Sequence, residues 1–493
     1  MGIVAKQAYA NTVSIVIGII AGAINTIIVL PHAFESSPED WGLVRILLSY
    51  SIIVAQVFGL GTYNIIIREY NNQKEQVLKK AILGLALLSA SVALLLLVFL
   101  SISFKKGFAV IIDADDLDLI YRNLIPLLVL AAVFVFNQIF TGFIVANHKT
   151  PMVQFVNEVY LKVSYLILAT VYLLNPFSFD IYLKIFVGTY VSSLLIFVFY
   201  SVKIGFSFHF KLKLLKVREL LVYGGYTVLN KGAGIIVNNL DLIMIGLILN
   251  LADVAYYILA FYIGAVIIIP QRAIQAPAYP MVSSFINNNE LEKLGKLYKQ
   301  TSINQLIVGG VLFVLIWVNI EGIYSIIPDK FSGGMWVVFF IGISKLFILS
   351  TGVSGAIIIF SKYYRVNLVF NLFLILLTVT TNYFLIIKYG INGAAMATAI
   401  TFLTYNVLKV VYIKWRFKIS PFDVQTVKSL IVLILSVFLG RMISIIPEYP
   451  SLEIIIKSVI ILLVLATGLY TLRVKAEILD LPKKVFKKYW KLD

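Results

Sequence analysis

Runs of about twenty mainly apolar residues recur along almost all of the 493-residue chain. A helix rises 1.5 Å per residue, so a run of about 20 apolar residues crosses the hydrocarbon core of a bilayer. Such runs predict fourteen transmembrane helices, at approximately 12–31, 43–67, 81–103, 120–146, 152–174, 181–202, 219–249, 254–282, 303–321, 335–360, 364–387, 391–413, 427–446 and 454–472. The first run lacks a small-residue cleavage site after a short apolar core, so we interpret it as a span and not as a signal peptide.

Composition supports the same fold class. The chain is 60% hydrophobic and 13% charged, whereas soluble domains are about half apolar and about a quarter charged. The absence of cysteine excludes disulfides and thiolate metal sites, and three separated histidines favour no metal cluster. The net charge of +17 does not indicate nucleic-acid binding, because the basic residues lie between apolar runs and not on a polar face. We predict an all-α polytopic membrane protein.

The basic residues also predict the orientation, because lysine and arginine beside a span resist translocation. With both termini in the cytoplasm, 26 Lys and Arg fall in inner segments, 5 in outer loops and 10 in spans. The clearest inner segments are 68–80, 203–218, 293–299 and 414–418, and the acidic outer ones are 32–41 and 113–118. The tail at 483–491 interleaves basic and aromatic residues and is expected on the anionic inner leaflet. This orientation suits a bacterial cytoplasmic membrane.

A weak internal repeat predicts the domain organisation. A shift of 216 residues places Gly18 on Gly234 and Asn25 on Asp241, and a shift of 213 places Gly142 on Gly355. Transporters are often built from two repeats, so we expect spans 1–6 to repeat as spans 7–12 in parallel orientation. The predicted parts are a six-helix bundle at 1–204, a basic linker at 205–218, a second six-helix bundle at 219–413, helices 13–14 at 414–472 and a basic tail at 473–493.

Four basic residues lie deep in predicted spans, namely Lys162, Lys231, Arg272 and Lys345. Each costs about 2.5–3.5 kcal/mol at the centre of the bilayer, so these side chains should face protein or water. Only two acids share this depth, Glu158 and Asp241. The excess of cations favours an anionic passenger.

Structural roles compete with binding roles for several of these residues. Glu158 and Lys162 have the i, i+4 spacing of an intrahelical ion pair, and Lys345 could serve an interhelical bond. Six further cations lie near span ends, where long side chains extend to the interface; they are Arg45, Lys184, Lys409, Lys428, Arg441 and Lys457. Among these we assign Arg45 to the site, because its span follows the polar face of span 1.

Polar faces occur on several spans, among them spans 1, 7 and 8. In span 7 a stripe within about 100° at 100° per residue contains Asn230, Lys231, Gly234, Asn238 and Asp241. Span 1 carries a similar face with Asn25, although Gly18 and Gly22 also fit close helix packing. Span 8 holds Arg272, Gln275 and Tyr279 among three prolines, which kink helices.

Several segments resemble the multidrug/oligosaccharidyl-lipid/polysaccharide exporter superfamily, and within it the Wzx-like polysaccharide flippases. They are NTVSIVIGIIAGAINTIIVLP at span 1, EDWGLVRIL and IIIREY around span 2, DLIMIGLILNLADVAYYILA at spans 7–8 and KYGINGAAMATAI before span 12. The resemblance implies two six-helix bundles around a central cavity, plus two extra helices, working by alternating access.

The resemblance also implies roles for the polar residues. The pyrophosphate-binding set would be Arg45, Lys231, Arg272, Lys345 and Lys162, and the polar or ion-coupling set Asn25, Asn238, Asp241, Glu158 and Gln275. The family implies no cofactor, with coupling to H⁺ or Na⁺ for which Asp241 is a candidate. The implied partners are a polyprenyl-pyrophosphate-linked glycan, membrane lipids and polysaccharide polymerase machinery.

The sequence therefore predicts a flippase that moves an undecaprenyl-pyrophosphate-linked oligosaccharide, an O-antigen or capsule repeat unit, from the inner to the outer leaflet. The alternative is a multidrug or cation antiporter of the same superfamily, against which the excess of deep cations weighs. An enzyme of the same pathway is disfavoured, because the chain shows no large outer loop, no phosphate-binding glycine loop and no paired carboxylates.

Overall fold

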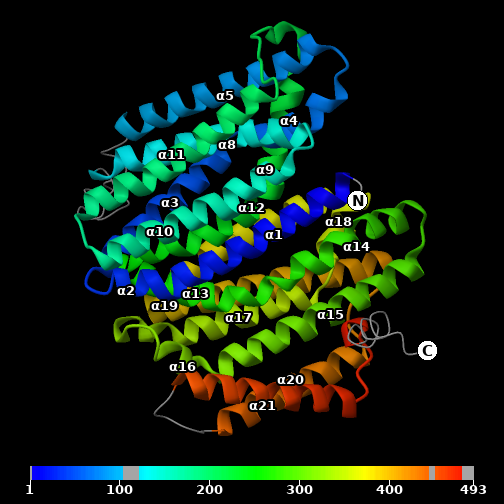
Figure 1. Ribbon diagram of the computed structural model, residues 1–493. Helices are drawn as coiled ribbons and strands as arrows, with labels where there is room; N and C mark the ends of the chain where they lie inside the picture. The colour runs from blue at the N-terminus through cyan, green and yellow to red at the C-terminus, as the bar shows by residue number, and fades with distance from the viewer. Residues whose placement is uncertain (1–2, 104–121, 444–449, 480–493) are drawn as a thin grey trace. The chain divides into compact units, whose positions relative to one another are not determined.

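The computed structural model describes residues 3–103, 122–443 and 450–479, and every regular element in these ranges is a helix (Figure 1). Twelve of these helices are long and apolar enough to cross a membrane, and thirteen if the bent helix α12 counts as one span. The predicted all-α polytopic fold is therefore confirmed, and the chain is a multi-pass membrane protein. The predicted outer segment 113–118 and the basic tail 483–491 lie outside the described residues.

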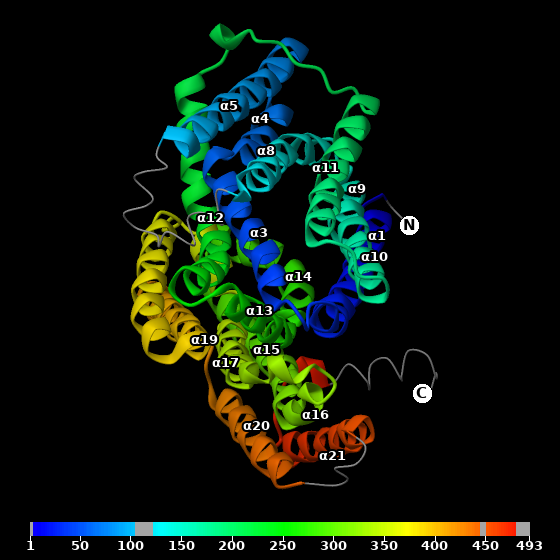
Figure 2. The ribbon, with the colours of Figure 1, turned by 90° about the vertical axis from the view of Figure 1, so that its left-hand side faces the viewer.

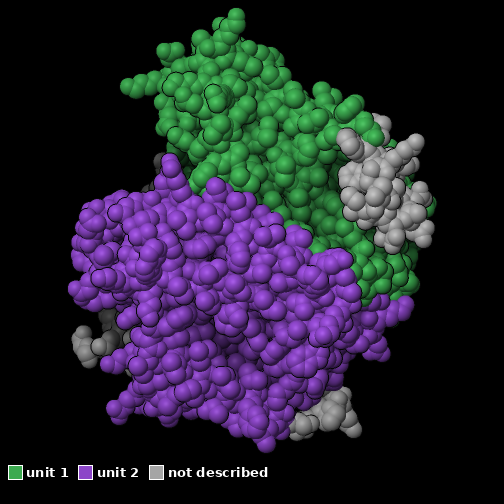
Figure 3. All heavy atoms as spheres, turned by 180° about the vertical axis from the view of Figure 1, so that it is seen from behind, with its two compact units in different colours: residues 1–255 green, residues 256–493 purple. Residues whose placement is uncertain are grey.

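The chain forms two compact units, residues 1–255 and 256–493 (Figure 3). The helices of the first unit are α1 (Ile3–Ala23), the π-helix η1 (Ile24–Val29), α2 (Leu30–Ala33), α3 (Pro38–Phe58), α4 (Thr62–Asn72), α5 (Gln76–Ser103), α8 (Leu124–Ala146), α9 (Thr150–Gln154), the π-helix η2 (Phe155–Tyr160), α10 (Leu161–Leu174), α11 (Phe179–Lys203), η3 (Leu212–Leu214) and α12 (Val217–Ile248).

Helix α13 (Leu251–Ala265) crosses the boundary between the units. The second unit continues with η4 (Val266–Ile268), α14 (Pro270–Asn287), α15 (Leu291–Val318), α16 (Ile320–Tyr324), η5 (Asp329–Gly334), α17 (Met335–Ser350), α18 (Ser354–Phe360), α19 (Val366–Phe417), α20 (Val424–Met442) and α21 (Pro450–Thr471). The division into bundles at 1–204 and 219–413 stays a prediction.

Helix α19 contains two predicted spans, 364–387 and 391–413. Its 52 residues would measure about 78 Å, more than twice the thickness of the hydrocarbon core. Gly390 interrupts the helical backbone with φ 57° and ψ −139°. This positive φ suits glycine, which has no Cβ to clash, so the chain reverses between the two spans at this residue.

Four other predicted spans contain interruptions, and of these the sequence analysis anticipated only the one in span 8, from its prolines. The π-helices η1 and η2 interrupt spans 1 and 5. Span 8 divides into α13, the 3₁₀ turn η4 and α14, because Pro270 cannot donate a backbone hydrogen bond and so begins a new helix. Span 10 divides into α17 and α18 at residues 351–353, where Gly352 has φ +51°. We call residues 351–353 the span-10 break.

In the first unit, α3 packs along α12 and α8. Glycine permits close approach: a Cβ on Gly42 would lie 1.9 Å from the backbone oxygen of Leu251, and one on Gly232 would lie 2.6 Å from the side chain of Gln56. Leu251 begins α13, whereas a Cβ on Gly246 of α12 would meet the side chain of Ile46. Contacts between 46 and 246 and between 56 and 232 show that α3 and α12 are antiparallel. This pair forms the centre of the unit.

Segments predicted on the inner side lie together in the first unit. The His209 N–H donates to the Lys80 carbonyl at 3.0 Å, which holds the 205–218 linker on the end of α5 (Figure 2). Asn71 donates to the Ala146 carbonyl at 2.9 Å, and Gln7 to the His148 carbonyl at 2.7 Å. The segments predicted to lie on one side of the membrane are therefore neighbours in the structure. That this side is the cytoplasmic one stays a prediction.

In the second unit, α17 packs on α19, and α15 packs on α14, α17 and α20. The chain after α21 returns to this core: the Ile478 N–H donates to Asn304 Oδ1 at 3.3 Å, and Lys428 Nζ donates to the Leu472 carbonyl at 3.0 Å. Val474 and Ala476 are buried in the same apolar cluster as residues of α15 and α20. These contacts fix helices 13 and 14 to α15.

Replacing Gly42 by alanine should lower the thermal unfolding temperature of the purified protein. The new Cβ meets a backbone carbonyl and not a flexible side chain, and overpacking of this kind costs about 1–3 kcal/mol. The matched control is Gly188→Ala on α11, where a Cβ meets nothing within 4 Å and alanine favours the helix. Equal unfolding temperatures for the two variants would contradict the proposed close packing of α3.

Candidate functional site

The structure places the predicted cations in different environments. Arg45 on α3 and Lys162 on α10 are half-buried, Lys345 on α17 is 5% exposed, and Arg272 on α14 is exposed. Lys231 lies in α12, and its side chain is outside the described residues. Arg45, Arg272 and Lys345 each have a polar or electrostatic partner, so the structure does not leave any of these three cations isolated.

Lys345 lies between two aromatic rings. Its Nζ is 5.1 Å from the ring centroid of Phe261 on α13 and 5.2 Å from that of Phe402 on α19. The negative face of an aromatic ring attracts a cation, by about 0.5–2 kcal/mol depending on desolvation. Lys345 thus joins three helices of the second unit, which fits the interhelical role that the sequence left open.

Glu158 and Lys162 form the intrahelical ion pair that their spacing allows. Lys162 Nζ lies 2.7 Å from Glu158 Oε2, and both side chains are partly exposed. The pair lies at the junction of η2 and α10 and packs on α1: a Cβ on Gly18 would lie 2.4 Å from the Glu158 backbone oxygen, and one on Gly22 would lie 3.6 Å from Lys162 Cδ. Gly18 therefore serves close helix packing, whereas the space beside Gly22 would accept a Cβ in ordinary van der Waals contact.

Asn25 is 2% exposed within the π-helix η1 of the first span. Among the described atoms its Oδ1 has no hydrogen-bond partner. A buried amide oxygen without a partner is energetically costly, and π-helical turns are frequent at functional sites. The role of Asn25 in the site stays a prediction.

The polar stripe of span 7 is divided between exposed and buried positions. Asp241 is 3% exposed, whereas Gly234 and Asn238 are exposed. Asp241 has a partner within the structure, as a buried carboxylate requires. Helix α12 is bent by 48° between Asn230 and Gly232, so the stripe does not form one straight face.

Gln275 on α14 contacts the span-10 break. Its Nε2 donates to the Gly352 carbonyl at 2.9 Å, and its Oε1 accepts a hydrogen bond from the Tyr279 hydroxyl at 2.9 Å. An interrupted membrane helix frees backbone carbonyls, which need donors from neighbouring helices. Gln275 therefore has a structural role in addition to the cavity role predicted for it.

Lys409 is the residue that the sequence analysis misplaced. It was expected to extend to the interface, yet it is 8% exposed and its Nζ lies 4.0 Å from the ring centroid of Tyr405, one turn earlier in α19. The expectation is wrong because helical side chains lean toward the helix N-terminus, which here points away from the end of α19. Lys409 lies near the C-terminal end of the predicted span 391–413, so its side chain leans back into the span. The direction of the span could therefore have predicted its burial.

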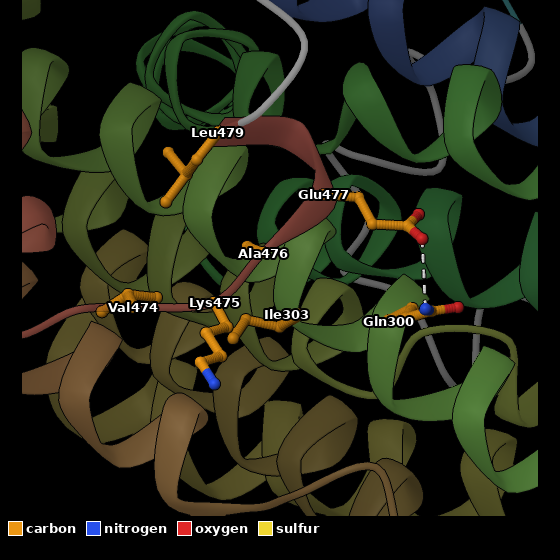
Figure 4. Close-up of a pocket in the computed structure, with 7 residues that line it drawn as sticks. All are labelled: Gln300, Ile303, Val474, Lys475, Ala476, Glu477 and Leu479. Atoms are coloured by element: carbon orange, nitrogen blue, oxygen red, sulfur yellow. Dashed lines mark hydrogen bonds between the residues drawn. The ribbon is translucent and has the colours of Figure 1, made fainter. Parts of the chain in front are cut away.

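A pocket of about 380 Å³ lies between α15 and the chain that follows α21, and no predicted site residue lines it (Figure 4). It is lined by Gln300, Ile303, Val474, Lys475, Ala476, Glu477 and Leu479. Gln300 Nε2 donates to Glu477 Oε1 at 3.1 Å across one edge. No group of three His, Asp or Glu side chains that could hold a metal ion is found in the described ranges.

Comparison with known proteins identifies the family. The sequence profile described as "Polysaccharide biosynthesis protein" matches residues 8–286, more than half of the chain. The chain belongs to this polysaccharide biosynthesis family. The match covers α1 to α14, and so includes every predicted site residue except Lys345.

A curated relative is the probable low-salt glycan biosynthesis flippase Agl15 of Haloferax volcanii, which is 24% identical over 226 residues. The alignment covers 43% of this chain and 46% of the relative, so the chain spans about half the length of the relative it matches.

Solved structures share the fold of this family member. The inward closed conformation of the lipid II flippase MurJ matches with a TM-score of 0.69 at 15% identity, covering 95% of this chain and 99% of that one. An inward-facing multidrug resistance MATE family transporter of the MOP superfamily matches with a TM-score of 0.62 at 14% identity, covering 81% and 93%. The fold is therefore that of MurJ and of the MATE transporters.

A double-mutant cycle on Glu158 and Lys162 should reveal favourable coupling. Glu158→Gln or Lys162→Met alone leaves one charge without its partner in the membrane and should lower the unfolding temperature, whereas the double variant should recover most of the loss. The expected coupling is roughly 1 kcal/mol, because both side chains are partly solvated. The measurement is thermal unfolding of the four proteins.

The exposed i, i+4 pair Glu292–Lys296 on α15 supplies the control. The same substitutions there should show no measurable coupling. Additive effects at Glu158 and Lys162 would contradict a stabilising pair in the first unit.

Proposed function

We propose that this protein is a flippase for a lipid-linked oligosaccharide. The observation that carries the proposal is membership of the polysaccharide biosynthesis family over residues 8–286. The fold shared with a lipid II flippase along 95% of the chain supports it, as does the partial alignment with a glycan biosynthesis flippase. The described residues form membrane spans and short connections. Such a chain suits a protein that moves a glycan across the membrane and does not alter it chemically.

The cargo proposed is an undecaprenyl-pyrophosphate-linked O-antigen or capsule repeat unit, moved from the inner to the outer leaflet of a bacterial cytoplasmic membrane with both termini in the cytoplasm. The charge of the pyrophosphate supports this choice. Phosphate gains more from a cation in a partly dewatered site than in bulk water, and arginine binds it through two parallel N–H donors. A polysaccharide polymerase is the proposed downstream partner.

Arg272 is the strongest candidate for pyrophosphate contact. It is exposed on α14, where Pro277 and Pro280 lie inside the helix, so its guanidinium is accessible on an element that bends readily. Arg45 and Lys231 are proposed as further phosphate contacts, with Asn25, Asn238 and Asp241 as polar neighbours. Lys345 and Lys162 are proposed to add positive potential from their existing contacts and not to bind the cargo directly.

The alternative function is export of drugs or cations, as in MATE transporters. It needs acidic or apolar binding surfaces for lipophilic cations. Asp241 fits this requirement as a buried acid, whereas Arg272 and Lys345 oppose it. We therefore favour the flippase.

Arg272→Glu and Lys231→Glu, introduced singly, should reduce surface polysaccharide in a strain that depends on this gene. Loss of a charge-assisted phosphate contact, and its replacement by repulsion, should lower export roughly tenfold or more. Arg272→Gln and Lys231→Gln should have smaller effects in the same direction. Surface glycan is measured by gel analysis at matched protein abundance.

The matched control is Lys184→Glu, which reverses the charge of an exposed lysine on α11 and should leave export unchanged. Full surface glycan from both glutamate variants would overturn the phosphate-contact proposal. Mass spectrometry of lipids that copurify with the protein separates the two functions, since a polyprenyl-pyrophosphate glycan supports the flippase and drug efflux without such a lipid supports the exporter.

A further inference from the structure

Four helices of the second unit meet at the span-10 break. From α14, Gln275 Nε2 donates to the Gly352 carbonyl at 2.9 Å; from α15, the Ser302 hydroxyl donates to the Ser350 carbonyl at 2.5 Å. From within the break, the Thr351 hydroxyl lies 2.9 Å from the Ile348 carbonyl and 3.2 Å from Asn406 Oδ1 on α19, and it shares its single proton between these two acceptors. The carbonyls freed by the interruption thus receive side-chain donors, and the break joins α17 to its neighbours.

Lys409 lies beside this break. Its Nζ is 4.0 Å from the position that a Cβ on Gly355 of α18 would occupy, and 4.0 Å from the ring centroid of Tyr405. It follows Asn406 by three residues in α19, so the two side chains lie on neighbouring positions of one helical face. The hydroxyl of Tyr405 donates to Asn371 Oδ1 at 2.7 Å, which leaves its ring face for Lys409.

Neither α18 nor α19, the two helices that enclose Lys409, carries a carboxylate. The chain contains no Asp or Glu between Asp329 and Asp423, a stretch that includes α17, α18 and α19. Of the elements around the break, α17 contributes Lys345 and α18 no ionisable side chain. Helix α15 contributes ionisable side chains only before Ser302, namely Glu292, Lys293, Lys296, Tyr298 and Lys299. Helix α14 contributes Arg272 and Tyr279, and α19 contributes Tyr405, Tyr412 and Lys414. Within the described part of the chain, Lys409 makes neither a hydrogen bond nor an ion pair.

A buried ionisable residue in a membrane span is expensive in its charged form and marks a functional site by default. A buried lysine can avoid the free-energy cost of its charge by releasing a proton, whereas an arginine stays charged in proteins. A proton also needs no cavity, which suits a side chain enclosed by α18 and Tyr405. These properties favour a proton over an anion as the ligand of Lys409.

We propose that Lys409 is a proton-binding site whose occupancy controls the geometry of the span-10 break. This deepens the proposed flippase function, on which it rests, by naming the coupling ion and the residue that carries it. On uptake, the Nζ lone pair forms an N–H bond with a proton from water; on release, that bond breaks and the proton returns to water on the other side of the membrane.

Protonation of Lys409 is coupled to the geometry of the span-10 break through the number of N–H donors on its side chain. The ammonium has three N–H donors to satisfy, whereas the neutral amine has two and a lone pair. Uncharged acceptors around the break include Asn406 Oδ1, which shares the Thr351 hydroxyl proton with the Ile348 carbonyl, and the backbone carbonyls of the break. Protonation therefore draws these acceptors toward Nζ and loosens the bond that fixes α17 to α19, and α18 moves with it.

The test is a spin label on α18 in the full chain. The sequence has no cysteine, so Ile359→Cys, at an exposed position of α18, gives one labelling site. The labelled protein is reconstituted in liposomes and its electron paramagnetic resonance spectrum is recorded across a pH series. We expect a reversible change of spectrum with pH, and no change for a label at Leu439→Cys on α20.

Variants of Lys409 then test whether this residue causes the change of the spectrum with pH. Lys409→Met removes the titrating group at similar volume and should hold the high-pH spectrum at every pH, without loss of thermal stability. Lys409→Arg should hold the low-pH spectrum because arginine stays charged. Lys388→Met, at an exposed lysine of α19, should titrate like the parent protein.

A pH response that persists in Lys409→Met, or the absence of any response in the parent protein, overturns the proposal. If Lys409→Met fails to fold, Lys409→Arg decides the outcome. A spectrum of Lys409→Arg that changes with pH as the parent's does would also overturn the proposal. The spectrum of the label reports the geometry of α18 in liposomes that contain no glycan. Its outcome is therefore independent of the surface-polysaccharide assay on Arg272, and the two proposals can fail separately.

Discussion

In a bilayer, each backbone N–H and C=O needs a partner within the protein, because lipid supplies none. The rest of this structure depends on that constraint. Uninterrupted helices meet it alone, and the interrupted ones meet it with side chains from their neighbours, as Gln275 and Ser302 do for the carbonyls of Gly352 and Ser350. Interruptions therefore become the points at which several helices are joined. Polar residues in these spans serve this purpose before they serve any passenger.

Charge is distributed unequally between the units. The first unit contains the buried acid Asp241 and the acid of the Glu158–Lys162 pair. The second contains buried Lys345 and Lys409 on helices that carry no acid. Aromatic rings take the place of carboxylates there, with Phe261 and Phe402 around one ammonium and Tyr405 beside the other. Rings stabilise a cation less than a carboxylate does, so these lysines keep a positive potential that a carboxylate would cancel.

The sequence predicted the spans well because apolar length is a direct consequence of bilayer thickness. It also predicted the Glu158–Lys162 pair, since the i, i+4 geometry is local. It did not predict η1, η2 or the span-10 break, because these depend on donors from distant helices and leave no pattern in neighbouring residues. Lys409 was misplaced for a simpler reason: distance from a span end was considered, but the direction in which a helical side chain leans was not. The roles of the site residues toward a cargo remain predictions.

The close antiparallel packing of α3 on α12 bears on how the protein is made. Gly42 approaches the backbone at Leu251, and Gly232 approaches Gln56, so about two hundred residues of chain separate surfaces that must meet. During synthesis, α3 is inserted long before its partner leaves the ribosome. Until then the face of α3 that carries Gly42 has no partner helix, and the first unit reaches its final form only after the chain has been extended through α12 and the start of α13.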